Sequence, residues 1–253
     1  MGRRLGQHFL ARQSVLEHIA EAAAPDPAAT LVEIGPGRGA LTAHLLTRAA
    51  RVIAIEVDPV LVHYLRAEFR DEPRLTIIAG DILKVDLAQW GLIAVAGNLP
   101  YYITSPILEK TLTLGDNLAQ AVFLVQEEVA QRLVAHPGTR DYGFLSVQTQ
   151  LLSQPELLFQ IPADAFRPRP KVDSAVVRLV PRSNSPAPDR AQFLQFASRC
   201  FRHKRKTIRN NLSAYYDLAL LDSTPATKNR AEQLSIPELA ALFGYLSQSK
   251  SKP

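Results

Sequence analysis

The first half of this chain alternates between strand-like and helix-like segments, and this alternation constrains the fold more than any other feature. Short apolar runs predict strands at 31–34, 51–57, 75–79, 93–96 and 121–125. Helical patterns are predicted at 14–23, 40–50 and 59–69, and Ser105-Pro106 opens another helix. Parallel strands need crossover connections, which helices supply on both faces of a sheet. The pattern therefore predicts an α/β fold with a doubly wound, mostly parallel, Rossmann-like sheet.

The alternation stops after about residue 142. A helical stretch at 144–152 precedes strand-like 156–161 and 175–180, which predict an antiparallel hairpin at one edge of the sheet. Residues 181–188 have the composition of a linker. Beyond them only helices are predicted, at 189–202, 205–214, 217–221 and 236–247. We expect an α/β domain over 1–182, a small all-α domain over 183–253, and a disordered tail at 247–253.

Three helix starts carry cap signals. Ser14 with Glu17 and Ser235 with Glu238 match the capping-box pattern. Asp58-Pro59 supplies an N-cap and a first-turn proline. These signals predict where the helices begin.

Composition limits the class of protein. Hydrophobic residues make up 47% and charged residues 21% of the 253 residues, as in a soluble globular protein. Cys200 is the one cysteine, which favours a reducing compartment. The chain lacks an apolar run of about 20 residues and an N-terminal signal core, so we expect a cytoplasmic protein without membrane contact. The six scattered histidines predict no metal site, and the net charge of +5 permits a polyanionic partner.

A glycine-rich loop follows the first strand of the alternating region. Gly35 and Gly37 let the backbone approach a ligand closely, and Glu56 ends the next strand 21 residues after Gly35. A carboxylate there accepts hydrogen bonds from a ribose diol. The alternatives are a tight turn and an exposed surface acid. The glycine loop and Glu56 together do not distinguish a dinucleotide site from an S-adenosylmethionine site. The spacing does depart from the dinucleotide fingerprint, because the glycine expected three residues after Gly37 is missing.

Two further polar residues follow the next strands. Asp81 comes after the third strand, where it would accept from an adenine amino group or cap the following turn. Asn98 comes after the fourth. Because parallel strands end at one edge, we expect Gly35, Glu56, Asp81 and Asn98 to lie together there.

Asn98-Leu99-Pro100-Tyr101 suits the activation of an exocyclic base nitrogen. The adenine amino group is a poor nucleophile because its lone pair is delocalised into the ring. Acceptance of both N–H bonds, by the Asn98 oxygen and a backbone carbonyl beside the proline, favours a pyramidal nitrogen. Tyr101 offers a stacking face for the base. The alternative is a β-turn after a strand.

Two segments concentrate positive charge. Arg167, Arg169 and Lys171 alternate with prolines next to Phe166, which suits a flipped base and its phosphates or, alternatively, an ordinary basic hairpin loop. A denser cluster on predicted helices contains Arg199, Arg202, Lys204, Arg205, Lys206 and Arg209. Charge runs are commonly solvated faces, but this one has no interspersed acid, so we expect RNA contact.

The ordered set of motifs resembles the ribosomal RNA adenine dimethyltransferase family, which includes the bacterial small-subunit RNA methylase. The motifs are Gly6-Gln7-His8-Phe9-Leu10, Val32-Glu33-Ile34-Gly35-Pro36-Gly37, Asn98-Leu99-Pro100-Tyr101, Tyr142-Gly143 with Leu145-Ser146-Val147, Phe166-Arg167-Pro168-Arg169-Pro170-Lys171-Val172-Asp173-Ser174-Ala175, and Arg205-Lys206-Thr207 with Arg209-Asn210-Asn211-Leu212. The resemblance covers nearly the whole chain. His8 and Tyr102 stand where many members have asparagine.

The resemblance implies a Rossmann-like methyltransferase sheet and a role for each matched residue. His8, Leu10, Gly35, Gly37, Glu56, Asp81 and Asn98 would bind S-adenosylmethionine. Asn98 to Tyr101 would hold the target adenine, and Phe166 would be the second aromatic around it.

The implied activity is dimethylation of adenine N6 in small-subunit ribosomal RNA, by a monomer acting on an assembling 30S particle. The alternatives are a large-subunit RNA methylase of the resistance type, a DNA adenine methylase and a non-catalytic ribosome assembly factor. A nicotinamide oxidoreductase is the most distant of them.

Overall fold

The computed structural model describes residues 9–24, 26–100, 103–183, 187 and 189–248. The chain forms two compact units, each of which contains two separate segments of the sequence. The first comprises Met1–Ala130 and Ser153–Pro181, and the second Gln131–Leu152 and Arg182–Pro253. The sequence predicts 131–152 as part of the first domain, whereas the structure groups this segment with the C-terminal helices. Within the second unit the Gly138 amide donates to the Glu232 carbonyl (2.7 Å), and Tyr142 packs against Phe201.

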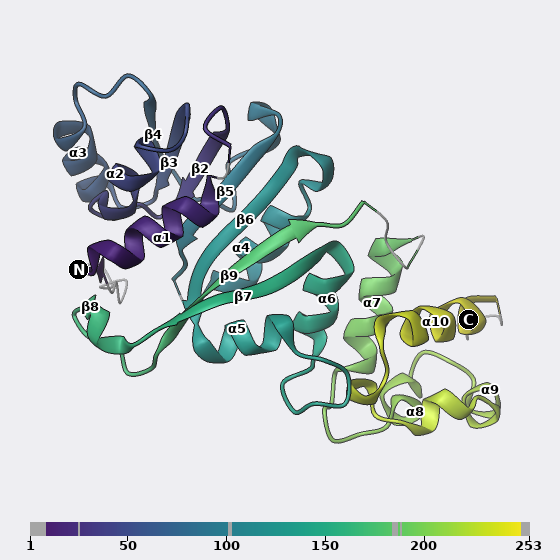
Figure 1. Ribbon diagram of the computed structural model, residues 1–253. Helices are drawn as coiled ribbons and strands as arrows, with labels where there is room; N and C mark the ends of the chain where they lie inside the picture. The colour runs from purple at the N-terminus through teal and green to yellow at the C-terminus, as the bar shows by residue number, and fades with distance from the viewer. Residues whose placement is uncertain (1–8, 25, 101–102, 184–186, 188, 249–253) are drawn as a thin grey trace. The chain divides into compact units, whose positions relative to one another are not determined.

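The first unit contains a seven-stranded sheet in the order β4-β3-β2-β5-β6-β9-β7 (Figure 1). Its strands are β2 (Thr30–Ile34), β3 (Arg51–Glu56), β4 (Leu75–Ala79), β5 (Ile93–Asn98), β6 (Leu118–Gln126), β7 (Ser153–Ile161) and β9 (Ser174–Pro181). Strands β2 to β6 pair in parallel, whereas β9 pairs antiparallel with both β6 and β7. The predicted mostly parallel sheet with an antiparallel edge hairpin is therefore confirmed. A separate two-stranded sheet joins β1 (Phe9–Leu10) to β8 (Phe166–Arg167).

Helices cover the parallel strands. The helices associated with the first unit are α1 (Gln13–Ala23), α2 (Ala40–Leu46), α3 (Pro59–Glu68), α4 (Thr104–Leu112) and α5 (Glu127–Val134), of which α5 runs into the second. Figure 1 shows α1 crossing one face of the sheet and α4 behind the strands. Helix α1 buries Leu16, Ile19 and Ala23 in a hydrophobic cluster with side chains of β2, β5 and β6. Because these strands are buried on both faces, they are nearly continuous apolar runs.

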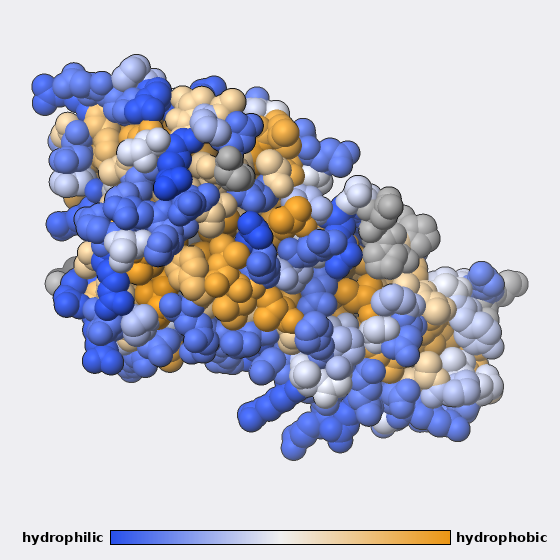
Figure 2. Space-filling view, viewed as in Figure 1, coloured by the Kyte–Doolittle hydropathy of each residue, from blue (hydrophilic) through white to orange (hydrophobic). Residues whose placement is uncertain are grey.

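The outer strand β7 is protected against pairing with another chain. Its sequence places Pro155 and Glu156 on the open edge strand, and its register shifts between Leu157 and Phe159. Proline and charge on an edge strand, together with a bulge, discourage edge-to-edge association. Figure 2 shows hydrophobic residues gathered over β7 and β9 on the viewed face, with hydrophilic residues around them.

The second unit is helical. Its helices are α6 (Phe144–Leu152), α7 (Arg190–Cys200), α8 (Ile208–Leu212), α9 (Leu218–Ser223) and α10 (Ile236–Gln248). Short 3₁₀ helices of the chain are η1 (Ala88–Trp90), η3 (Gly115–Asn117), η4 (Ala163–Ala165), η5 (Pro225–Lys228) and η6 (Ala231–Gln233). The core of this unit is aromatic, because Phe196 packs against Tyr216 and Phe243. Cys200 is buried there, as expected, and burial raises the pKa of its thiol.

The cap signals succeed at two of three helix starts. Asp58 accepts the Val60 amide at 2.8 Å, and Ser235 and Glu238 form the predicted capping box. The Ser14 prediction is wrong, because α1 already begins at Gln13 after an N-cap residue, Arg12, that makes no side-chain cap bond. Helix α10 continues to Gln248, so residues 247–248 are helical, and the rest of the predicted tail, 249–253, lies outside the described residues.

Candidate functional site

The parallel strands bring four predicted site residues to one edge of the sheet. In the registers, Ile34 lies opposite both Ile55 and Gly97, and Glu56 lies opposite Ala79. Gly35, Glu56, Asp81 and Asn98 therefore all stand at or just beyond the carboxyl ends of β2, β3, β4 and β5. This edge is where doubly wound sheets bind their ligands.

The glycine loop borders open space. Gly35 and Gly37 have positive φ angles of 66° and 61°, which favour glycine. The Gly35 amide donates to the Ile55 carbonyl at 2.9 Å, which fixes the loop to β3. A Cβ at Gly35 would have no heavy atom within 4 Å. The loop thus leaves the room that a closely approaching ligand needs.

Glu56 is a buried acid that joins the loop to the end of β3. Its side chain is 2% exposed, so the alternative of a surface acid is wrong. Oε2 accepts the Gly37 amide at 3.1 Å, and Oε1 accepts the amides of Val57 and Asp58 at 2.9 and 3.0 Å. A carboxylate has about four acceptor positions. The geometry therefore lets Glu56 orient the loop and still accept from a ligand hydroxyl.

Glu33 is a second buried acid, to which the sequence analysis gave no role. It lies on β2, is 2% exposed, and its Oε2 accepts the Thr42 hydroxyl at 2.6 Å. Burial, with a further contribution from the nearby Glu56 charge, raises the pKa of Glu33 to about 7. The signal available in the sequence was an acid inside an otherwise apolar strand.

Asp81 serves the local turn as well as the edge. Its Oδ1 accepts the Leu83 amide at 3.0 Å, as the cap alternative predicted. Lys110 of α4 donates to the Leu83 carbonyl at 3.1 Å and so ties this turn to the helix that follows the Asn98 motif. With this one bond, the Asp81 carboxylate keeps further acceptor positions for a ligand.

The backbone around Asn98 is tightly held. A Cβ at Gly97 would lie 2.6 Å from the Ile34 carbonyl oxygen, so the neighbouring strand leaves room only for glycine. The buried Leu99 donates its amide to the Leu124 carbonyl at 3.0 Å. The Pro100 carbonyl accepts two hydrogen bonds, from the Ile103 amide and the Thr104 hydroxyl, each at 3.1 Å. Tyr101 and Tyr102 lie outside the described residues.

Leu10 and Phe166 meet in the small β1–β8 sheet, which the sequence analysis missed. They are opposite one another in its register, and the Ala11 amide donates to the Ala165 carbonyl at 3.0 Å. Both side chains are buried in the main hydrophobic cluster, with Phe166 only 1% exposed. In this conformation the Phe166 ring therefore presents no face for base stacking. His8 lies outside the described residues.

The basic residues of the first unit lie in the segment after Phe166. Arg167, Arg169 and Lys171 are exposed. Arg167 is held locally, because its guanidinium donates to the carbonyls of Asp164 and Phe166, both at 2.8 Å.

The second basic cluster lies largely in a turn. Helix α7 ends at Cys200 and α8 begins at Ile208 after the N-cap Thr207, so the prediction of helix at 201–202 and 205–207 is wrong. Thr207 accepts the Asn210 amide, which sets the later start. The exposed Arg202, Lys204, Arg205 and Lys206 are therefore turn residues.

Several side chains of this basic cluster already interact with other groups of the protein. Arg209 is paired with Asp222, with Nη2 and Oδ2 3.0 Å apart, and Lys204 donates to the Arg140 carbonyl. The Arg199 guanidinium lies 4.2 Å from the centre of the Tyr215 ring. Arg202 donates to the hydroxyl of the same tyrosine at 3.2 Å.

The described residues contain no helix long and apolar enough to cross a membrane. In the same ranges no cluster of three histidine, cysteine or acidic side chains has the geometry to hold a metal ion.

The fold and the edge geometry define a class of protein. The antiparallel hairpin distinguishes this sheet from the all-parallel dinucleotide fold. Together with the open Gly35 loop and the acid at the end of β3, it defines a Rossmann-like methyltransferase.

Comparison with known proteins identifies the family. A family model described as ribosomal RNA adenine dimethylase matches residues 2–248. The Ribosomal RNA small subunit methyltransferase A of Chlorobium phaeobacteroides is 42% identical over 244 residues, covering 95% of this chain and 89% of the relative. The protein of the same name from Chlorobaculum tepidum is 42% identical over 247 residues, with coverages of 96% and 88%. This chain belongs to the ribosomal RNA adenine dimethylase family.

Solved structures share the fold. A dimethyladenosine transferase from Plasmodium falciparum superposes with a TM-score of 0.79 at 23% identity, covering 95% of this chain and 98% of that one. The 23S rRNA methyltransferase ErmE gives a TM-score of 0.70 at 29% identity, with coverages of 95% and 100%.

Proposed function

We propose that this protein transfers methyl groups from S-adenosylmethionine to N6 of two adjacent adenines in small-subunit ribosomal RNA. The observation that carries the proposal is the common edge of the sheet, where the Asn98 motif follows β5 beside the open Gly35 loop. The relatives at 42% identity bear a small-subunit name, which favours this substrate over large-subunit RNA.

The residues of the edge fit an adenosyl cofactor. When bound, S-adenosylmethionine supplies a methyl group on a positively charged sulfur, which is already a good leaving group. Gly35 leaves room for its amino-acid part, and Gly37 supports the same loop with its positive φ. Glu56 accepts from the ribose, and Asp81 accepts from the adenine amino group. We assign His8, Leu10 and Asn98 to the same ligand by their match to the family motifs.

Asn98 and one backbone carbonyl hold the target amino group. The Pro100 carbonyl is already the acceptor for Ile103 and Thr104 at the start of α4. We therefore assign the second acceptor to the carbonyl of Leu99, next to Asn98. Tyr101 stacks on the base, and Phe166 joins it only after its ring has left the core. The amino group loses its proton after transfer, so no general base is required.

The test is the variant Asn98→Ala, with Asn117→Ala as a matched control at the opposite end of the sheet, just before β6. Tritiated S-adenosylmethionine is incubated with purified small-subunit particles, large-subunit particles or duplex DNA. We expect label in the small subunit only and its loss in Asn98→Ala. Calorimetry should show unchanged cofactor affinity in Asn117→Ala and largely retained affinity in Asn98→Ala, which loses only one of the proposed cofactor contacts. Turnover retained by Asn98→Ala would refute the assignment.

Two alternatives have distinct outcomes in this experiment. Label on large-subunit RNA identifies a methylase of the resistance type, whose fold ErmE shares. Tight binding of small-subunit particles without any label identifies a non-catalytic assembly factor.

The partner is an assembling 30S particle, which the protein meets as a cytoplasmic monomer. Arg167, Arg169 and Lys171 in the first unit and Arg202, Lys204, Arg205, Lys206 and Arg209 in the second are the proposed phosphate contacts. Phosphate contacts release counterions, so affinity for the particle should fall steeply with salt. Arg209 should contribute least, because Asp222 already neutralises it.

A further inference from the structure

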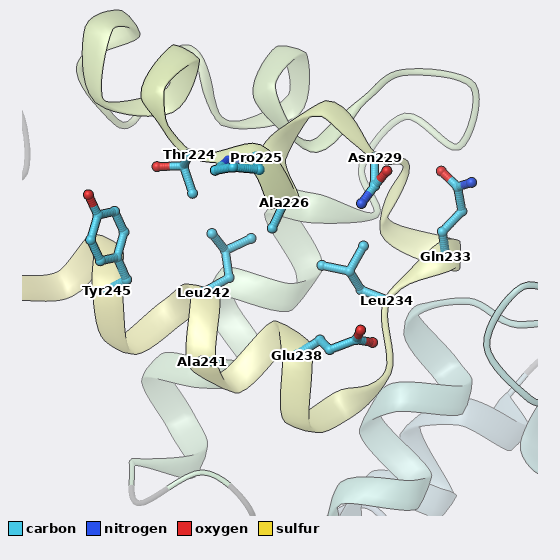
Figure 3. A pocket seen from close by; sticks show the side chains of 10 residues that line it. All are labelled: Thr224, Pro225, Ala226, Asn229, Gln233, Leu234, Glu238, Ala241, Leu242 and Tyr245. Atoms are coloured by element: carbon cyan, nitrogen blue, oxygen red, sulfur yellow. The ribbon is translucent and has the colours of Figure 1, made fainter.

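The second unit contains a pocket of about 420 Å³ that the proposed methyl transfer does not use. It lies between η5 and η6 on one side and α10 on the other (Figure 3). Its volume falls in the range of about 300–1,000 Å³ that holds small organic groups.

One end and the floor of the pocket are apolar or aromatic. Tyr245 stands at one end with its side chain 51% exposed, and Leu234 and Leu242 point into the space (Figure 3). Ala226 faces them from η5. A phenol ring beside a flat aliphatic floor suits a planar heteroaromatic ring, which stacks on such a surface.

The other end supplies polar groups that recognise the edge of such a ring. The Asn229 side chain projects into the space, and its amide group has no hydrogen-bond partner among the described residues (Figure 3). The Gln233 Oε1 accepts the Arg230 amide, and the Gln233 NH₂ group is left as a donor. Glu238 lies on α10, on the other side of Leu234 from Asn229 (Figure 3), and its Oε2 accepts both the amide and the hydroxyl of Ser235. Hydrogen bonds from Ser235 lower the pKa of Glu238, so its carboxylate is ionised and only accepts. Such an end favours a ring that carries an amino group.

Two exposed cationic residues adjoin Asn229 in the sequence. Lys228 and Arg230 are the chain neighbours of Asn229, and both are exposed. Cationic side chains beside a stacking site are what a nucleotide needs, because its phosphates enter with the base.

We propose that this pocket binds an unpaired nucleobase with an exocyclic amino group, belonging to the RNA substrate and distinct from the adenines that are methylated. Tyr245 stacks on the base, Asn229 accepts from its amino group, and Lys228 and Arg230 meet the adjacent phosphates. The inference rests on the proposed function only in taking RNA as the ligand. It adds a second point of base recognition, which fixes the substrate on the helical unit.

The test compares Tyr245→Leu, Tyr245→Phe and Asn229→Ala with Tyr64→Leu, which removes a similarly exposed tyrosine (41%) from α3. Affinity is measured for small-subunit particles and for protein-free small-subunit RNA. Tyr245→Leu and Asn229→Ala should weaken both by about fivefold or more, since stacking on one base is worth about 1–3 kcal/mol. Tyr245→Phe and Tyr64→Leu should stay within about twofold of the parent.

Turnover separates this inference from the proposed function. At saturating particle concentration, the rate of methyl transfer by Tyr245→Leu should equal that of the parent protein, because the pocket binds rather than reacts. Binding needs no turnover, so it reports on the pocket even if the parent protein transfers no methyl group.

Three results would overturn the inference. The first is unchanged affinity in both Tyr245→Leu and Asn229→Ala. The second is a loss confined to particles and absent on protein-free RNA, which would mean that the pocket contacts a ribosomal protein. The third concerns short oligonucleotides: the parent should prefer oligo(A) to oligo(U), and the same preference in Tyr245→Leu would exclude the pocket as its source. If Tyr245→Leu does not fold, Asn229→Ala decides all three.

Discussion

At the scale of single residues, Thr104 controls the shape of the Asn98 motif from outside it. Its hydroxyl donates to the Pro100 carbonyl at 3.1 Å, at the point where the chain leaves the motif and enters α4. This bond occupies an acceptor position of the Pro100 carbonyl. It also holds Pro100 in place and so helps to orient the Leu99–Pro100 peptide group. Thr104 is a positioning residue, because it touches the backbone and no reacting group.

We expect Thr104→Val to lower the rate of methyl transfer by about two- to tenfold, the worth of one net hydrogen bond. Cofactor affinity should be unchanged. Thr113→Val is the control, since the Thr113 hydroxyl makes the same kind of bond to the Lys110 carbonyl at the other end of α4. Steady-state kinetics with particles checks both variants, and equal losses would mean that only helix stability was affected.

Glu33 should make stability depend on pH. Its pKa is raised from 4.5 to about 7 by burial, so the folded state holds a proton that the unfolded state has released between these values. The free energy of unfolding is therefore highest below pH 4.5 and falls as pH rises through 7. The loss is roughly 3 kcal/mol for this shift.

Glu33→Gln removes the titration and keeps an acceptor for Thr42. Its free energy of unfolding should equal that of the parent near pH 4, below both pKa values, and exceed it by roughly 3 kcal/mol at pH 8.5. Denaturant unfolding at both pH values measures the difference, with Glu68→Gln on the exposed face of α3 as the control. A difference that does not change with pH would show that Glu33 is ionised in the folded protein.

The sequence predicts residues at strand ends better than side-chain partners. Gly35, Glu56, Asp81 and Asn98 could be placed because parallel strands end at one edge. The burial of Phe166 and the pairing of Arg209 with Asp222 could not, because both depend on residues from distant or later elements. The local capping role of Asp81 was foreseen as an alternative, since Asx turns are short-range.

At the scale of elements, the turn from the glycine loop into α2 depends on Gly39. Its φ is 82°, and a Cβ there would lie 2.5 Å from the ring of Phe69 at the end of α3. The glycine thus lets α2 and α3 approach each other.

Gly39→Ala should lower the free energy of unfolding by more than the strain of a positive φ in alanine accounts for. Gly138 has nearly the same φ of 84° but nothing within 4 Å of a Cβ, so Gly138→Ala measures the conformational cost of about 1–2 kcal/mol. The excess in Gly39→Ala reports the contact with Phe69, and we expect at least about 1 kcal/mol from displacing a packed ring. Thermal unfolding compares the two, and equal costs would contradict the close approach.

The start of a helix could be predicted from the sequence where its capping residue was correctly identified. Asp58 and Ser235 set their helices as predicted, whereas the helices predicted at 189–202 and 205–214 extend too far into the basic turn, whose lysines and arginines are good helix formers. Thr207 overrides this preference by capping α8.

At the scale of the molecule, the second unit is discontinuous in sequence. Its two segments adjoin, because the Arg182 amide donates to the Leu152 carbonyl at 2.9 Å. Periodicity identified the helix at 144–152 but carries no information on which core a helix joins.

We expect residues 131–152 fused directly to 182–253 to fold cooperatively, whereas 183–253 alone should not. The isolated fragment lacks the Tyr142 ring and the Gly138 bond to Glu232. Circular dichroism melts and dispersed amide spectra distinguish the two constructions. A cooperative transition in 183–253 would restore the simple boundary near residue 182.

The order of the sheet also has a consequence for synthesis. Strand β6 is almost entirely buried, yet its outer partner β9 comes about 55 residues later in the chain. At a translation rate of about 5–20 residues per second, the apolar edge of β6 waits roughly 3–11 seconds for its neighbour. During that time β6 is the exposed edge strand of the nascent sheet. In the finished sheet the edge strand is β7, whose bulge and proline discourage pairing with other chains. Nascent chains that stall between residues 126 and 174 should therefore be the species that chaperones bind most strongly.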